Sequence, residues 1–246
     1  MVQNSIYIGV SGQLSLARRM DALAQNMANV NTAGFRAQGL KFDQLLSKRA
    51  VNHGDRPSFV SAGRSYIDTR PGNITKTSNP FDIAIIDTKA WLSIQTPNGV
   101  SYSRDGRMNM TSDGQLVSVK GYAYLDQSGA PIQLDPKGGA PVIRPDGTIY
   151  QGDRPVGVLG LFQFPDNTKL SYAPNSSVVG DKAPLPIDDR STAKISQGFV
   201  EGSNVNGITE MTNLISVTRA FEQMESLLKV QEDEHLEAIK TLGNVN

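Results

Sequence analysis

Apolar residues recur at helical spacing near the N-terminus of the chain. They are separated by alternating steps of four and three, at Leu16, Met20, Leu23, Met27 and Val30. Steps of this size place side chains on one face of a helix. The pattern predicts a helix over residues 5–31, with Gly34 closing its end in a left-handed conformation.

A longer stripe of the same kind occupies the C-terminal end. We name it the C-terminal seam: Leu214, Val217, Phe221, Met224, Leu228, Gln231, His235, Ala238 and Leu242. Steps of three and four sustained over about four heptads favour a coiled coil. An ordinary amphipathic helix that packs on its own domain has the same periodicity, so the pattern leaves both interpretations open. Asn206 is a suitable N-cap for this helix.

The middle of the chain follows a different pattern. All 13 prolines lie between Pro57 and Pro186, and a proline inside a helix costs ~3 kcal/mol. Short apolar runs there are separated by the turn dipeptides at 98–99, 113–114 and 146–147. Asn-Gly and Asp-Gly between such runs predict hairpins. Residues 156–164 are predicted to form one strand, and the spacing of turns suggests a sandwich or an irregular barrel.

These patterns together predict an α+β fold. The N- and C-terminal helices are expected to pair as a coiled-coil-like arm domain around a mainly antiparallel β central domain. The predicted parts are an N-terminal helix of the discontinuous arm domain, a connector, the β-rich domain, a second connector and the C-terminal helix: 1–35, 36–75, 76–189, 190–205 and 206–246.

Charge supports pairing of the two ends. The whole chain is neutral, with 24 basic and 24 acidic residues. Residues 1–50, however, hold six bases against two acids, which gives +4, and residues 201–246 hold three against eight, which gives −5. Opposite charges favour association and help to fix its register. Solvated helix faces carry similar charge runs, so this interpretation also stays open.

Composition argues against several functional classes. A neutral chain lacks the excess of Lys and Arg that a dedicated nucleic-acid binder needs. With no cysteine and two histidines, it offers no thiolate metal site and no Cys nucleophile. His53 is expected in a surface loop, and His235 is expected to be a seam residue and not a ligand. We expect no catalytic residue, metal, cofactor or small-molecule substrate.

The N-terminus does not read as a secretory signal. Such a signal needs a basic start followed by about 7–15 consecutive apolar residues. Here the first residues are interrupted by polar side chains and by the pair Arg18 and Arg19. No run approaches the roughly 20 apolar residues of a membrane-spanning helix. If the protein leaves the cytoplasm, it is expected to do so without a cleaved signal.

Several motifs resemble the flagellar basal-body rod and hook family. Residues 23–36 read LAQNMANVNTAGFR, which resembles the sequence that ends the N-terminal helix in that family. The β-domain resemblance is carried by TSNPFDIAI at 77–85, YSRDG at 102–106 and DGQL at 113–116. The C-terminal resemblance is carried by GFVEGSNVN at 198–206, EM at 210–211 and RAFE at 219–222. These motifs follow the family's order along the chain.

The N-terminal motif also has a physical interpretation of its own. Asn26, Asn29 and Asn31 are poor helix-interior residues, but their amides satisfy free backbone groups at helix ends. Gly34 permits a positive φ, and Phe35 is then expected to pack back onto the helix end. We take these five residues as a candidate assembly and helix-end motif.

The resemblance implies a structural rod subunit. In such a protein the terminal helices pack along the axis of the assembly, other rod subunits and further copies of itself are the partners, and the rod spans the periplasm and transmits motor torque. Export through the flagellar type III apparatus is implied, and Phe42 with Leu46 resembles a short export signal. Trp91 and Leu92 after Lys89 and Ala90 resemble the proximal-rod branch; the distal-rod branch is the alternative.

Two other classes stay open on the sequence alone. A soluble enzyme, for example one that degrades cell wall, would need two acids that converge in a cleft. A secreted adhesin or effector would need an exposed aromatic or basic patch on the β domain.

Overall fold

The two stretches with helical periodicity form the two helices of the structure, a computed structural model that describes residues 2–41, 44–46, 58–60, 64–188 and 194–243. Helix α1 spans Val2–Ala28 and helix α2 spans Gly207–Gly243. Asn206 caps α2 as predicted, because its Oδ1 accepts hydrogen bonds from the backbone N–H groups of Ile208 and Thr209, both at 3.1 Å. Neither described helix combines the length and the apolar content needed to cross a membrane.

Helix α1 ends earlier than residue 31. Two turns follow Ala28, in which Thr32 N donates to Asn29 O at 3.1 Å and Phe35 N donates to Thr32 O at 3.2 Å. Gly34 has the expected left-handed backbone, with φ +68°, but it lies six residues beyond the helix. The asparagines after Met27 compete for backbone hydrogen bonds and therefore favour turns over another helical turn.

The chain divides into two compact units. The first consists of Met1–Ala28, Gln38–Ser65 and Asn206–Asn246, and the second consists of Asn29–Ala37 and Tyr66–Val205. We call the first the helical unit and the second the central unit. Each unit is assembled from segments that lie far apart in the sequence.

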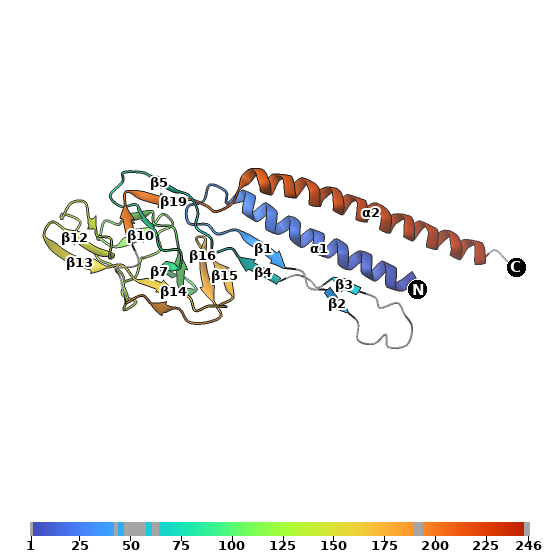
Figure 1. Cartoon of the computed structure of the whole chain (residues 1–246), viewed down its shortest axis with the longest axis horizontal. Coiled ribbons are helices and arrows are strands. Elements are labelled where there is room, and N and C mark those ends of the chain that lie inside the picture. Colours follow the sequence, from blue (N-terminus) through green and yellow to red (C-terminus); the bar gives the residue numbers. More distant parts are fainter. Residues whose placement is uncertain (1, 42–43, 47–57, 61–63, 189–193, 244–246) are drawn as a thin grey trace. The chain divides into compact units, whose positions relative to one another are not determined.

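Helices α1 and α2 run antiparallel and lie side by side in the helical unit (Figure 1). Asn26 Nδ2 donates to Glu210 Oε2 at 3.2 Å near the start of α2. Farther along α2, a Cβ at Gly12 would lie 3.3 Å from Met224 Cε, and one at Gly9 would lie 2.5 Å from Leu228 Cδ2. Glycine at these positions therefore lets the two helices approach closely.

The helical unit also contains short strands: β1 (Gln38–Lys41), β2 (Gln44–Leu46), β3 (Ser58–Val60) and the start of β4 (Arg64–Ile67). Strands β2 and β3 are antiparallel. These strands lie within residues 36–75, which were predicted to form a connector.

The central unit is rich in antiparallel strands. Its main sheet has the order β15-β16-β8-β7-β14-β17: Leu170–Ala173, Ser177–Gly180, Gly99–Ser103, Ala90–Thr96, Leu161–Gln163 and Leu185–Pro186. A three-stranded sheet contains β11 (Val142–Ile143), β12 (Thr148–Gln151) and β13 (Arg154–Val158). Three further pairs are β5 (Ile74–Lys76) with β19 (Phe199–Glu201), β6 (Ile83–Ile85) with β18 (Ile195–Gln197), and β9 (Met108–Met110) with β10 (Leu116–Ser118).

Strand β7 lies in the middle of the main sheet and carries the centre of the core. Leu92 is 1% exposed and Ile94 is 0% exposed, and both pack in one cluster with Ile83 and Ile149. All three predicted turns join hairpins. The turn between β7 and β8 consists of Pro97 and Asn98, so it lies one residue earlier than the predicted turn at Asn98 and Gly99.

The prediction of one strand over 156–164 is wrong. The segment belongs to two strands in different sheets, β13 and β14, which are separated by Leu159 and Gly160. A Cβ at Gly160 would lie 2.5 Å from Asp126 O and 2.6 Å from Ser93 Oγ. The strand breaks where these segments approach closely at a glycine, which the mostly apolar sequence of residues 156–164 does not reveal.

Candidate functional site

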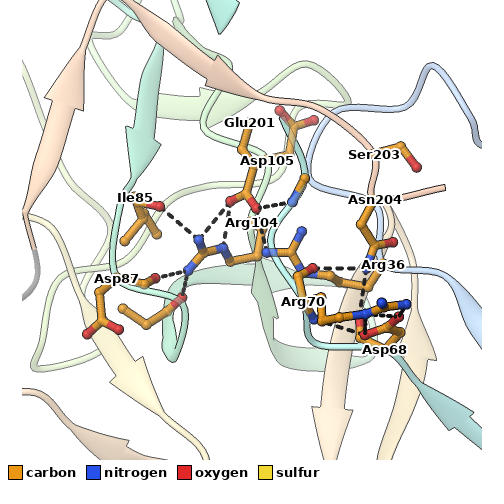
Figure 2. A network of polar contacts seen from close by, with 12 residues as sticks. Arg36, Asp68, Arg70, Ile85, Asp87, Arg104, Asp105, Glu201, Ser203 and Asn204 are labelled. Carbon is orange, nitrogen blue, oxygen red and sulfur yellow. Dashed lines mark hydrogen bonds and ion pairs between the residues drawn. The ribbon is translucent and has the colours of Figure 1, made fainter. Parts of the chain in front are cut away.

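Four separate segments of the central unit meet around one carboxylate, that of Glu201 (Figure 2). Arg36 Nη2 donates to Glu201 Oε1 at 2.6 Å, and Gly72 N donates to the same oxygen at 3.0 Å. Arg104 Nε and Nη2 both lie 2.8 Å from Glu201 Oε2. We call Arg36, Arg104 and Glu201 the Glu201 cluster.

All three members of the Glu201 cluster are buried, with at most 1% of each residue exposed. A buried ion needs a counter-charge and hydrogen bonds, because removing it from water is expensive. The cluster holds two cations and one anion. Glu201 is thus the carboxylate on which the burial of both guanidinium groups depends.

Arg104 extends the cluster to the connection between β6 and β7. Its Nη1 donates to the carbonyl oxygen of Asp87 at 2.6 Å and also to that of Ala90, and its Nη2 donates to Ile85 O at 2.8 Å. Figure 2 shows the side chain reaching between this backbone and Glu201. Burial lowers the pKa of Arg104, and the Glu201 carboxylate opposes that shift.

Arg36 is less completely satisfied. Within the described part of the chain, its Nε and Nη1 atoms have no hydrogen-bond acceptor. Its Cζ lies 5.9 Å from the centre of the Trp91 ring, where the negative face of the ring attracts a cation. The position of Arg36 is therefore set by Glu201 and by Trp91 together.

Gly34 and Phe35 are held against the same cluster. Gly34 N donates to the backbone oxygen of Glu201 at 2.8 Å, and a Cβ at Gly34 would lie 2.2 Å from Asp105 N. The Phe35 ring stacks on Tyr172 of β15, with centroids 5.5 Å apart and planes 6° from parallel. The contact with the backbone of 104–105 thus leaves no room for a side chain at position 34, and the positive φ favours glycine separately.

Tyr172 adds a hydrogen bond to the same segment, because its hydroxyl donates to the carbonyl oxygen of Arg36. Burial raises the pKa of the Tyr172 hydroxyl, so it stays protonated as a donor.

The side chain of Asn204 binds the backbones of two other segments, 34–37 and 68–72. Its Oδ1 accepts from Ala37 N at 2.6 Å, while its Nδ2 donates to Asp68 O at 3.0 Å and to Arg70 O at 2.9 Å. Asp68 N also donates to Ala37 O at 2.8 Å. The 34–37, 68–72 and 201–204 segments therefore form one hydrogen-bonded clasp.

The asparagines of the N-terminal motif have separate surroundings. Asn26 is 2% exposed, and its side chain donates to Gln38 O at 3.0 Å and accepts from Gln38 N at 2.8 Å within the helical unit. Asn29 Oδ1 accepts from Thr32 Oγ1 at 3.1 Å, and Asn31 is exposed. Asn29 thus serves the turn after α1, and Asn26 ties α1 to β1. An assembly role for the motif stays a prediction.

The C-terminal seam forms the less exposed face of α2. Val217 is 5% exposed, and Leu214, Phe221, Met224 and Leu228 are half-buried. His235 and Leu242 lie in α2, but their side chains are outside the described residues, as is Phe42. Leu46 lies in β2, and its side chain is likewise not described.

Sequence reasoning missed the Glu201 cluster, although all three residues lie within the quoted motifs. Two short sequences could have indicated buried charges: Gly34-Phe35-Arg36 and Val200-Glu201-Gly202. In each, one charged residue stands beside glycine and a large apolar residue. A charge in such a setting is rarely buried without a partner. The sequence contained no indication of which partner each charge would meet.

The described residues contain no group of three His, Asp or Glu side chains that could hold a metal ion. One cavity of about 450 Å³ in the central unit is lined by Trp91, Phe164, Arg70, Lys89 and Asp166 among others. The hydrogen-bonded clasp joins three segments of the central unit to one another, so its contacts serve to hold the fold together.

Three family models match the chain in order. They are described as flagella basal body rod protein over residues 6–36, flagellar hook protein FlgE/F/G D1 domain over 85–151, and flagellar basal body rod FlgEFG protein C-terminal over 196–239.

Curated relatives match along nearly the whole length. The flagellar basal-body rod protein FlgF of Mesorhizobium japonicum is 45% identical over 99% of both chains. FlgF of Rhizobium meliloti is 40% identical over 98% of this chain and 99% of its own. FlgF of Caulobacter vibrioides is 31% identical over the full length of both.

Replacement of the shared carboxylate tests the energetics of the cluster. Glu201→Gln keeps the size of the side chain but removes the charge of the one carboxylate that both buried guanidinium groups bind. We expect the free energy of unfolding of the central unit to fall by about 3–5 kcal/mol. Urea unfolding followed by fluorescence of Trp91, the single tryptophan, measures this directly. Asp113→Asn, at an exposed acid of the same unit, should change it by less than about 0.5 kcal/mol. Equal effects of the two variants would contradict the assignment.

A pair of glycine variants isolates the close approach at residue 34. Gly34 and Gly121 both have positive φ, at +68° and +84°, so alanine at either position costs about 1–2 kcal/mol in backbone strain. Only at Gly34 would the new Cβ meet backbone, since nothing lies within 4 Å of one at Gly121. We expect Gly34→Ala to destabilise the unit by about 1–3 kcal/mol more than Gly121→Ala. Thermal or urea unfolding of both variants gives the comparison.

Proposed function

The chain belongs to the flagellar basal-body rod protein family, and on that premise we propose that it is a structural subunit of the proximal rod and not an enzyme. The observation that carries this proposal is the match to FlgF rod proteins over nearly the entire length of both chains. The three family models, which follow one another along the chain, support it independently. The partners are other rod subunits and further copies of this chain.

The surface of α2 supports assembly through the terminal helices. On the side away from the C-terminal seam, Ile208 is 83% exposed, Met211 is 59% exposed and Ile215 is 50% exposed. These positions follow steps of three and four, so they form a second apolar stripe on one helix. An exposed stripe of this kind is typical of a surface that another protein covers. We propose that neighbouring rod subunits cover it.

The pairing of α1 with α2 is proposed as a coiled-coil-like arm. Its support is the antiparallel contact at Gly12 and Met224 and at Gly9 and Leu228, together with the seam periodicity and the opposite charges of the two ends. In this proposal the arm consists of helices α1 and α2, which lie within the predicted ranges 1–35 and 206–246. The predicted β domain at 76–189 follows the predicted connector at 36–75 and precedes the one at 190–205.

The finer features of the function follow from the family and remain part of the proposal. The subunit reaches the rod by the flagellar type III apparatus without a cleaved signal, stacks in the periplasm, and transmits torque. Phe42 and Leu46 are the proposed export signal. Because α2 leaves one of its two apolar stripes exposed, the helical pair is expected to gain further stability from neighbouring subunits.

The exposed stripe provides a test of assembly that spares the fold. Ile215→Glu places a charge on the stripe, where half of the isoleucine is already in water. We expect the free energy of unfolding of the monomer to change by less than about 0.5 kcal/mol. The variant should nevertheless be absent from isolated basal bodies, and swimming in soft agar should be lost, because a charge buried between subunits is unpaired.

Gln223→Glu is the matched control, because it adds the same charge at an exposed polar position of α2. It should assemble and swim normally. Normal assembly of Ile215→Glu would contradict the proposed role of the stripe.

A further inference from the structure

The strands that close the central unit come from its two ends. Strand β18 pairs with β6, so that Ile195 lies opposite Ile85, and β19 pairs with β5, so that Val200 lies opposite Thr75. Ile83 and Ile85 of β6 are at most 1% exposed and belong to the main core cluster, as does Ile195. The hydrogen-bonding partner of an early core strand is thus among the last residues of the unit.

The Glu201 cluster likewise depends on a residue near the end of the unit, in this case through charge. Arg36 and Arg104 precede Glu201 by 165 and 97 residues. Until Glu201 arrives, burying either guanidinium would take a cation out of water without its counter-ion, at an effective penalty of several kcal/mol per ion. The two arginines therefore favour a hydrated, open state of any chain that lacks the C-terminal segment.

Arg104 spreads this effect into the centre of the unit. Its guanidinium holds the carbonyl groups of Ile85, Asp87 and Ala90, which lead into β7. Arg36 in turn lies over Trp91, the second residue of β7. A hydrated Arg104 or Arg36 would leave the start of the central strand without these contacts.

We propose that Glu201 is an electrostatic latch that makes closure of the whole central unit conditional on the arrival of residues 195–204. A chain delivered from its N-terminus, as every chain is during synthesis, then keeps the unit open until its last strands are free. The latch is a property of folding and stands independently of the proposed function. It would keep the unit open during passage through any narrow export channel that is entered from the N-terminal end.

The test uses refolding of the full chain, followed by pulsed hydrogen exchange and mass spectrometry. Peptides from β7 and β8, residues 90–103, and from β18 and β19, residues 195–201, report when each region becomes protected. In the natural sequence we expect both regions to gain protection with one rate constant. Protection of 90–103 in a distinctly faster phase would overturn the proposal, and this readout needs no variant.

Two variants separate a latch from a contact that forms late. If closure depends on Glu201, Glu201→Gln should slow protection of both regions by about tenfold or more, since the interaction is already made in the folding transition state. If Glu201 only adds stability after closure, refolding should keep its rate and unfolding should accelerate, which would refute the latch. Asp113→Asn should refold at the natural rate.

Discussion

The central unit depends on one carboxylate that pairs with two buried guanidinium groups. Glu201 accepts hydrogen bonds from Arg36, Arg104 and the backbone of Gly72, and each charged member is at most 1% exposed. Such an arrangement tolerates the removal of one partner badly, because the remaining charges stay in a medium of low dielectric. The surrounding hydrogen bonds of Asn204 and Tyr172 fix the backbone that presents these charges. Local geometry and charge balance are therefore inseparable here.

The same cluster also explains how the central unit holds together, although it is built from two separate stretches of the sequence. The segment 29–37 enters it and the strands β18 and β19 complete it, although more than half of the sequence lies between them. Contacts of such high sequence separation carry a loop-closure cost before they contribute stability. Charge pairing and core completion both act at this closure, where Ile195 meets β6 and Glu201 meets Arg36.

The helical unit has a different constraint. Helix α2 presents the C-terminal seam on one side and the stripe of Ile208, Met211 and Ile215 on another, so that a single partner helix covers only part of its apolar surface. Gly9 and Gly12 let α1 approach α2 closely, and the residues of the second stripe stay exposed. A subunit of a rod needs such a surface, because its stability in the assembly must come partly from its neighbours.

The sequence by itself determined the two helices, the Asn206 cap, the hairpin turns and the α+β class. These features arise from periodicity and from the local chemistry of Asn, Gly and Pro, which act over a few residues. It also contained the family motifs. It did not predict the break at Gly160 or the lack of space for a side chain at Gly34, because both follow from segments that approach from elsewhere. Tertiary structure alone decided that Arg36, Arg104 and Glu201 share one buried site, since their partners are set by chain topology and not by spacing.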